Sequence, residues 1–382
     1  MAALSVVFWH FMLGFYQGIV FNPAYGLLGT PFYGFVHGTA AVSVFLVLSG
    51  YVLTKKFFES GDPWLLIMGA IKRWPRLWLM VFISIMGSWA LLHNGVTAYR
   101  VAGVFAGSPW LQLYGLSLKP AFDPSFTAAF KQSMFSVFFV RESFGFNPLL
   151  WTVRVELLGS YIAFALAGLI AVMNKKTSYI FLVSLFTAVA LHFYDPFFVP
   201  FVPGVVMARF APQIKNIKLP AALLFLAVGI TCLGYRAPIG FYAFLSPLGD
   251  MNPDFVRLYI SLIGACLIMA SFIGCKPLKQ SMQGPLAAYL GRISYPLFVV
   301  HLLVLFSLAS WVFVRLHANH PYNVAALGAG LVLLVASLAV ASLLAVADVY
   351  WIESVNSIST WLKRRITERL PPKYFQLKRR ST

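Results

Sequence analysis

Long apolar stretches recur along almost the whole chain, and they constrain its fold more than any other feature of the sequence. Several reach the roughly 20 residues that an α-helix needs to cross a hydrocarbon core of ~30 Å. In this chain of 382 residues, 60% are hydrophobic and only 10% are charged, a composition that a water-soluble domain of this length could not solvate. We therefore expect an all-α, polytopic membrane protein.

About ten transmembrane helices are expected. Residues 1–354 would form a single membrane domain, and residues 355–382 would form a basic cytosolic tail on anionic headgroups. The first apolar stretch has no basic lead and no small-residue cleavage site, so it is interpreted as a retained helix. The ten expected spans lie near 3–22, 36–54, 76–93, 149–172, 178–193, 196–212, 219–235, 255–274, 293–313 and 322–350.

The net charge of +18 reports membrane topology rather than nucleic-acid binding. Most of the 29 Lys and Arg residues fall in alternate loops and in the tail, and the positive-inside rule then places both termini in the cytosol. The membrane would be the cell (inner) membrane in a bacterium or an endomembrane in a eukaryote.

The longest connection, 94–148, would lie on the outer side, and we expect it to cap the site on the side where the acceptor binds. It contains Trp110 and enough apolar residues to pack at the membrane surface, so an interfacial or re-entrant helix within it is an equal expectation. The three cysteines, Cys232, Cys266 and Cys275, lack metal-ligand spacing, so no metal site is expected.

Polar residues within the expected spans are functional candidates, because ionisable groups are costly at membrane depth, and four of them can be compared by depth. At ~1.5 Å per residue, His10 and His301 lie at one depth, Ser49 lies within a turn or two of it, and Glu156 ends near the midplane. These four helices would direct polar groups toward one layer.

Arg73 and Arg76 lie at the cytosolic start of the third expected span. Two guanidinium groups on one helical turn suit a phosphorylated cytosolic donor. Basic residues that flank a span are also simple topology signals, and the sequence leaves both interpretations open.

Several segments together resemble the acyltransferase-3 family of integral-membrane O-acyltransferases, and they occur in the family's order along nearly the whole chain. They are His10, VFLVLSGY at 44–51, the pair Arg73 and Arg76, LWTVRVE at 150–156, ISYPLFVVH at 293–301 and WIE at 351–353. The family's fold is a ten-helix membrane domain, in agreement with the count above. The arginine that the family usually carries eleven positions before the first-helix histidine would fall before Met1.

The resemblance implies transfer of an acyl group, often acetyl, from a coenzyme A thioester to a hydroxyl of a carbohydrate, lipid or small molecule. The expected partners are therefore acyl-CoA, a hydroxylated acceptor (polysaccharide, lipid-linked sugar or metabolite) and the bilayer. His10 would be the general base, and Glu156 would orient His10 or bind acceptor hydroxyls. Arg73 and Arg76 would hold the phosphates of coenzyme A or polarise the thioester at the cytosolic mouth of the site.

Four further residues are expected to contact substrate or to support the site structurally: Ser49, Trp151, Tyr295 and His301. Ser49 favours close helix packing in lipid, and His301 is equally explained as a tie between helices. Glu156 is alternatively explained by a salt bridge to Arg154 or Arg76.

Two other classes of function remain open at this stage. A proton-coupled secondary transporter would use His10, Glu156 and His301 as a relay, although no internal symmetry is visible in the sequence. A non-catalytic membrane scaffold or sensor would leave the same residues replaceable.

Overall fold

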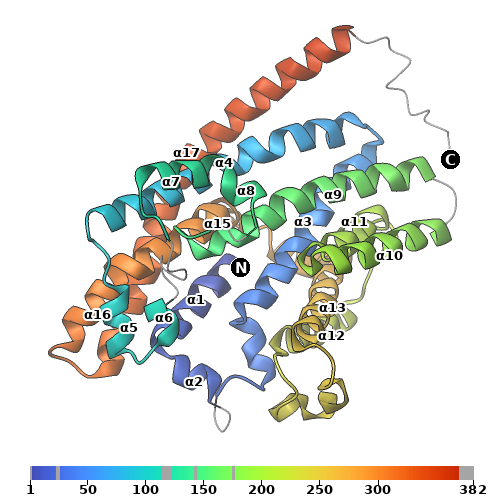
Figure 1. Cartoon of the computed structure of the whole chain (residues 1–382). Helices are drawn as coiled ribbons and strands as arrows, with labels where there is room; N and C mark the ends of the chain where they lie inside the picture. The colour runs from blue at the N-terminus through green and yellow to red at the C-terminus, as the bar shows by residue number, and fades with distance from the viewer. Residues whose placement is uncertain (1, 23–25, 114–121, 142–143, 174–176, 370–382) are drawn as a thin grey trace.

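A computed structural model describes residues 2–22, 26–113, 122–141, 144–173 and 177–369, and within these ranges the chain is helical with no strand (Figure 1). The helices, in chain order, are α1 Ala2–Phe15, α2 Gln17–Phe21, η1 Pro31–Phe35, α3 Gly38–Ser60, α4 Trp64–His93, α5 Tyr99–Phe105, α6 Pro109–Leu113, α7 Phe126–Lys131, η2 Gln132–Ser136, α8 Val137–Phe139, η3 Pro148–Leu150, α9 Trp151–Met173, α10 Thr177–Tyr194, η4 Pro196–Phe198, α11 Phe201–Arg209, α12 Leu219–Gly234, η5 Gly240–Leu248, α13 Pro253–Gly274, α14 Lys276–Ser281, α15 Pro285–Val304, η6 Leu305–Ala309, α16 Ser310–His317 and α17 Tyr322–Arg369.

Among the described residues, seven helices are long and apolar enough to cross a membrane, and three more apolar helices are shorter. Together they coincide with the ten expected spans, which confirms the all-α polytopic fold. The shorter helices are Ala3–Phe15, Pro196–Arg209 and Leu219–Gly234. At ~1.5 Å per residue each is roughly 20–24 Å long, so none alone covers a ~30 Å hydrocarbon core.

Two of the expected helix boundaries are wrong. The third span starts at Trp64, well before the expected position 76, and continues to His93 as α4. The expected start followed the basic cluster, but the structure accommodates Arg73 inside the helix because Glu156 neutralises its charge. The first expected span, 3–22, is interrupted between α1 and α2 at Tyr16.

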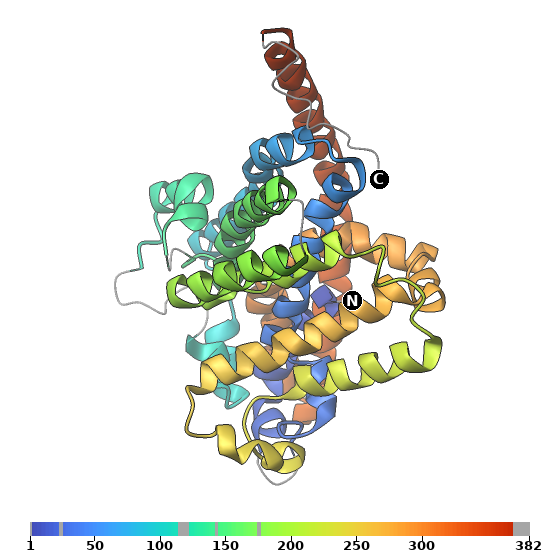
Figure 2. The same cartoon turned by 90° about the vertical axis from the view of Figure 1, so that its right-hand side faces the viewer.

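The last helix is also longer than expected. α17 continues past 350, and across the expected domain boundary at 354, to Arg369, and Figures 1 and 2 show its end projecting from the other helices. Arg364 Nε donates to Glu368 Oε1 at 2.9 Å, one helical turn away, and Lys363 Nζ lies 3.7 Å from Asp62 Oδ2. The first pair supports the helix locally, and the second ties it to the segment that precedes α4. Residues 370–382 of the expected tail lie outside the described residues, as do Lys119 and Pro120 of the long connection.

Local sequence explains where several helices begin and end. Asn252 precedes α13, and its side chain accepts the backbone N–H groups of Asp254 and Phe255 at 3.0 and 3.3 Å, with Pro253 at the first helical position. This is the arrangement expected of an N-cap. α3 ends at Gly61, whose φ of 71° is the left-handed conformation that glycine adopts without strain.

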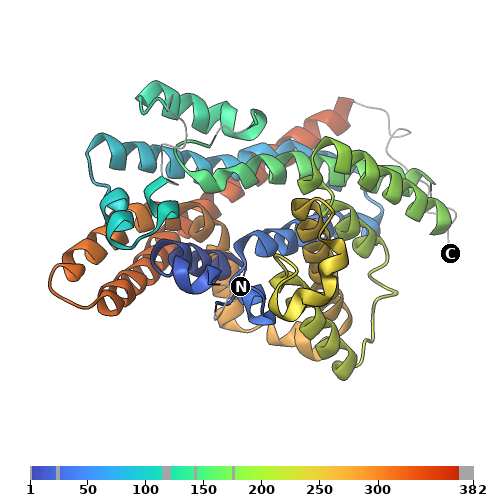
Figure 3. The same cartoon turned by 60° about the horizontal axis from the view of Figure 1, so that its bottom comes forward.

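α1 occupies a central position in the assembly. It contacts α3 on one side and α15 and α17 on the other, and Figure 3 shows it between these parts of the chain. The largest apolar core combines residues of α1, α4, α15 and α17 with residues of the 94–148 connection. The polar side chains of α1 are therefore enclosed by helices from both ends of the sequence.

α3 and α11 pack with their backbones in contact, because each contributes a glycine at the crossing. A Cβ atom on Gly204 would meet Val47 O, and it would lie 2.9 Å from Tyr51 N and 3.0 Å from the Gly50 Cα. Such small residues let helices approach closely in membrane proteins.

We predict opposite effects for two glycine-to-alanine substitutions in helices. Gly291→Ala in α15, where a Cβ would meet nothing within 4 Å, should stabilise the protein by ~0.5–1 kcal/mol because alanine restricts the unfolded chain. Gly204→Ala should instead destabilise it by ~1–3 kcal/mol through overpacking. Thermal unfolding of the two variants in detergent measures both, and equal shifts would contradict the close packing of α3 on α11.

Candidate active site

Two histidines from opposite ends of the chain form a buried imidazole pair. His10 of α1 is 6% exposed and His301 of α15 is completely buried. Their ring centroids are 5.2 Å apart, and His301 Nε2 lies 3.1 Å from His10 Nδ1. The sequence placed the two residues at the same depth, and the structure brings them into direct contact.

Backbone carbonyls determine the protonation of both rings. His10 Nδ1 lies 2.8 Å from Val6 O, and His301 Nδ1 lies 3.1 Å from Leu297 O. Since a carbonyl oxygen only accepts, each Nδ1 carries its proton in these contacts. The Nε2 of neutral His301 is then an acceptor, and the Nδ1–H of His10 is shared between Val6 O and that nitrogen.

This arrangement leaves the Nε2 of His10 as the free basic nitrogen of the pair. Among the described residues, no hydrogen bond involves that atom. A neutral imidazole whose Nδ1–H is bonded and whose Nε2 lone pair is free has the tautomer required of a general base.

The 94–148 connection supplies a cover for His10. Trp110 of α6 stacks on the imidazole with a centroid separation of 5.4 Å and an interplanar angle of 28°. α6 is tied to α1 by Ser108, whose hydroxyl donates to Leu13 O at 2.8 Å and accepts from Leu111 N at 3.2 Å. His10 is therefore enclosed between Trp110 and His301.

The end of the same connection is anchored beside His301. The Asn147 side-chain amide donates to Ser84 Oγ and to Val299 O, both at 2.8 Å, and Ser84 Oγ donates to Val299 O at 2.7 Å. A π-helical turn, η6, follows His301 within the same long helix. Such turns are frequent at functional sites.

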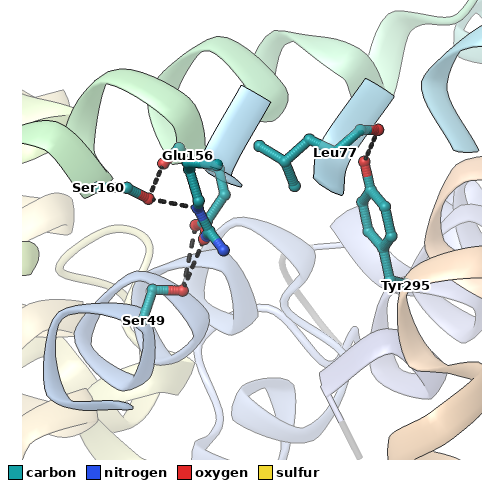
Figure 4. A network of polar contacts seen from close by, with 6 residues as sticks. Ser49, Leu77, Glu156, Ser160 and Tyr295 are labelled. Carbon is teal, nitrogen blue, oxygen red and sulfur yellow. Dashed lines mark hydrogen bonds and ion pairs between the residues drawn. The ribbon is translucent and has the colours of Figure 1, made fainter. Parts of the chain in front are cut away.

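A second polar group, the glutamate cluster, joins three helices. Glu156 of α9 forms an ion pair with Arg73 of α4 and accepts from Ser49 Oγ of α3 at 3.0 and 3.1 Å (Figure 4). Arg73 Nε also donates to Ser160 Oγ at 2.7 Å, and Ser160 Oγ donates to Glu156 O. The side chains of Arg73 and Glu156 are only 11% and 5% exposed.

The glutamate cluster is separate from the imidazole pair. Among the described residues, no hydrogen bond links the two groups, so Glu156 contacts Arg73 and Ser49 rather than His10. Among the ion pairs of the described residues, Glu156 pairs with neither Arg76 nor Arg154, and Arg154 pairs instead with Asp195. Ser49 serves as a hydrogen-bond donor as well as a small residue at a helix contact.

Other expected site residues take individual positions. Tyr295 lies on α15, and its hydroxyl donates to Leu77 O at 2.8 Å (Figure 4). Arg76 is exposed, and its charge interacts with that of Asp348. Trp151 packs on Phe197 with a centroid separation of 4.8 Å.

Sequence reasoning missed several polar residues of the site. Ser160, Ser84 and Asn147 gave no signal beyond being polar residues in or beside apolar segments. A further buried histidine outside these two groups, His37, is 1% exposed and bonded through Nδ1 to Leu233 O at 2.8 Å. Among the described residues, no group of three or more His, Cys, Asp or Glu side chains is placed to hold a metal ion.

The fold and the buried polar groups define a polytopic membrane protein with a pair of imidazoles enclosed among its apolar helices. The model of the acyltransferase-3 family, described as an acyltransferase domain, matches residues 1–346. The chain belongs to this family, and it is an integral membrane acyltransferase. No curated protein and no solved structure gives a significant match to the chain.

We predict that replacing either member of the Arg73–Glu156 pair alone destabilises the protein more than replacing both. Glu156→Leu or Arg73→Met alone should each destabilise the protein by ~3–5 kcal/mol, because a buried charge loses its partner. The double variant Arg73→Met with Glu156→Leu should recover most of that loss. Thermal unfolding of all three variants tests this, and additive losses in the double variant would show that the two charges are not coupled.

Proposed function

We propose that this protein is an O-acyltransferase that moves an acyl group, acetyl foremost, from acyl-CoA to a hydroxyl of a carbohydrate, lipid or small-molecule acceptor. The single observation that carries the proposal is the free Nε2 of His10, in an imidazole whose other nitrogen is bonded to Val6 O and His301. Alcohols are weak acids, so transfer to a hydroxyl needs a base held in this tautomer.

In the proposed reaction, the acceptor oxygen attacks the thioester carbonyl while His10 Nε2 takes the hydroxyl proton. The tetrahedral intermediate then collapses, the carbon–sulfur bond breaks, and the imidazolium returns its proton to the thiolate of coenzyme A. His301 Nε2 and Val6 O accept from the Nδ1–H of the charged His10 ring, so they stabilise its positive charge and hold its orientation. His301 is thus a positioning residue.

The donor would bind beside the α4 arginines, with the two residues in different roles. The guanidinium of Arg73 is committed to Glu156, so its contribution to phosphate binding is reduced. Arg76 is exposed and offers donors to the phosphates of coenzyme A. Under the positive-inside rule this end of α4 and both termini face the cytosol, and the capping connection faces outward.

The transporter alternative receives no added support from the geometry. A relay through His10, His301 and Glu156 needs a continuous hydrogen-bonded path, and among the described residues Glu156 is bonded within its own cluster.

We predict that His10→Ala lowers transfer by about 10²–10⁴-fold, the usual contribution of a general base. The measurement is incorporation of label from acetyl-CoA into lipid and polysaccharide extracts of membranes that contain the protein. His37→Gln is the matched control, because it removes another buried imidazole bonded to a carbonyl and should retain activity at equal folded protein. Normal labelling with His10→Ala would overturn the proposed base.

A pair of variants tests the positioning role of His301. His301→Gln keeps an amide oxygen that can accept from His10, whereas His301→Leu cannot. Activity should fall more in the leucine variant, and its pH–rate profile should shift, because the charged His10 ring loses an acceptor. Equal losses with unchanged pH profiles would mean that His301 only packs.

We also predict that acetyl-CoA stabilises the detergent-purified protein. A ligand at a hundred times its dissociation constant raises the free energy of unfolding by ~2.7 kcal/mol. The shift should be smaller with dephospho-CoA and should disappear in Arg76→Ala. If no acyl-CoA raises the unfolding temperature of the wild-type protein, the donor assignment fails.

A further inference from the structure

A cleft of about 390 Å³ lies away from the imidazole pair, between the start of α9, η4 and the start of α13. We call it the α9–α13 cleft. Its charged side chains are Arg141, Arg154, Asp195 and Asp254, and most of the remaining wall is apolar. Neither the imidazole pair nor the glutamate cluster contributes to it.

The cleft lies at one boundary of the hydrocarbon layer. Three membrane-spanning helices have their ends there: Pro148–Met173 begins, Thr177–Tyr194 ends and Pro253–Gly274 begins. The ends of spans lie at the level of lipid headgroups. A ligand in this cleft would therefore have its polar part at headgroup depth.

Positive charges at the cleft outnumber negative ones once Arg257, which pairs with Asp254 but does not line the cleft, is counted. Arg154 Nη1 and Arg141 Nη2 lie 3.2 and 3.5 Å from the same oxygen, Asp195 Oδ2, while Asp195 Oδ1 accepts from Phe197 N at 3.3 Å. One carboxylate thus serves two guanidinium groups. Asp254 adds no net charge because it pairs with Arg257.

The two arginines have donors left over. Arg154 is 13% exposed in its side chain, and its Nε is buried without a hydrogen-bond partner among the described residues. The Arg141 side chain is 68% exposed and also lines the cleft. A buried guanidinium N–H without a hydrogen bond costs free energy unless another acceptor, such as a ligand oxygen, bonds to it.

Apolar side chains surround this charged centre. Val140, Phe144 and Phe255 line the cleft, and the neighbouring Phe193 and Tyr194 are 82% and 64% exposed. A small water-borne anion would leave this rim uncovered, whereas the hydrocarbon chain of an amphiphile would cover it.

We propose that the α9–α13 cleft binds the phosphate group of a membrane amphiphile, with Arg141 and Arg154 on the phosphate oxygens and the chain along the apolar rim. Guanidinium groups bind phosphate through paired, charge-assisted hydrogen bonds. One anionic group would neutralise the excess charge and satisfy the unused donors. The inference does not depend on acyl transfer, so failure of the His10 experiments leaves it unaffected.

Native mass spectrometry of the detergent-purified protein tests the proposal with three probes. Phosphatidic acid has both phosphate and chains, diacylglycerol has only the chains, and inorganic phosphate has no chain. We expect one retained phosphatidic acid adduct under conditions that strip diacylglycerol. Equal retention of the two lipids would overturn the phosphate site, and displacement of phosphatidic acid by equimolar inorganic phosphate would overturn the requirement for an amphiphile.

Variants then locate the adduct. Arg141→Ala should weaken phosphatidic acid binding by roughly tenfold or more, the loss expected for one charge-assisted hydrogen bond, and its exposure makes misfolding a minor concern. Val140→Trp should weaken binding while keeping both charges, because it fills the apolar wall. Arg315→Ala removes another exposed arginine, on α16 outside the cleft, and should bind normally. Wild-type affinity in Arg141→Ala, or an equal loss in Arg315→Ala, would refute this assignment.

Discussion

The buried ion pair between Arg73 and Glu156 is the constraint on which the rest of the membrane domain depends. Neither charge would be tolerated alone in a hydrocarbon environment, so α4 and α9 must lie in contact wherever these two residues are enclosed. Ser49 adds α3 to the same unit through the carboxylate. Neutralising Arg73 also lets α4 continue as one helix from Trp64 through the basic segment to His93. The pair is thus an architectural element first, and it holds the helix that also carries Arg76.

Helix carbonyls, rather than a carboxylate, determine the tautomers of the two histidines in the imidazole pair. Both histidines bond through Nδ1 to the carbonyl four residues earlier, at Val6 and Leu297, so each helix selects the tautomer of its own histidine. Contact between the rings then leaves His10 Nε2 as the nitrogen of the pair that has no hydrogen bond among the described residues. Trp110 stacks on the same ring, which places a segment of the 94–148 connection where it can limit access of water to that nitrogen.

α9 separates two environments within a single turn. Arg154 faces Asp195 at the α9–α13 cleft, while Glu156, two residues later, faces Arg73 inside the bundle. Each ionisable residue has a partner of opposite charge, as burial requires. At the cleft, two arginines share the single carboxylate of Asp195, whereas a structural ion pair has one partner for each charge. The proposed phosphate group would neutralise the extra positive charge.

Composition, apolar periodicity and ordered motifs were enough to predict an all-α polytopic fold, ten apolar helices and membership of the acyltransferase-3 family. They also predicted that His10 and His301 lie at one depth, because helical rise converts sequence position into depth. They could not predict that Glu156 pairs with Arg73, that Trp110 covers His10 or that α4 begins at Trp64. Those features depend on which helices are neighbours, and the apolar surfaces of membrane helices resemble one another too closely for the sequence to specify the neighbours. Only the tertiary structure decided them, through close glycine contacts such as that at Gly204 and through the need of each buried charge for a partner.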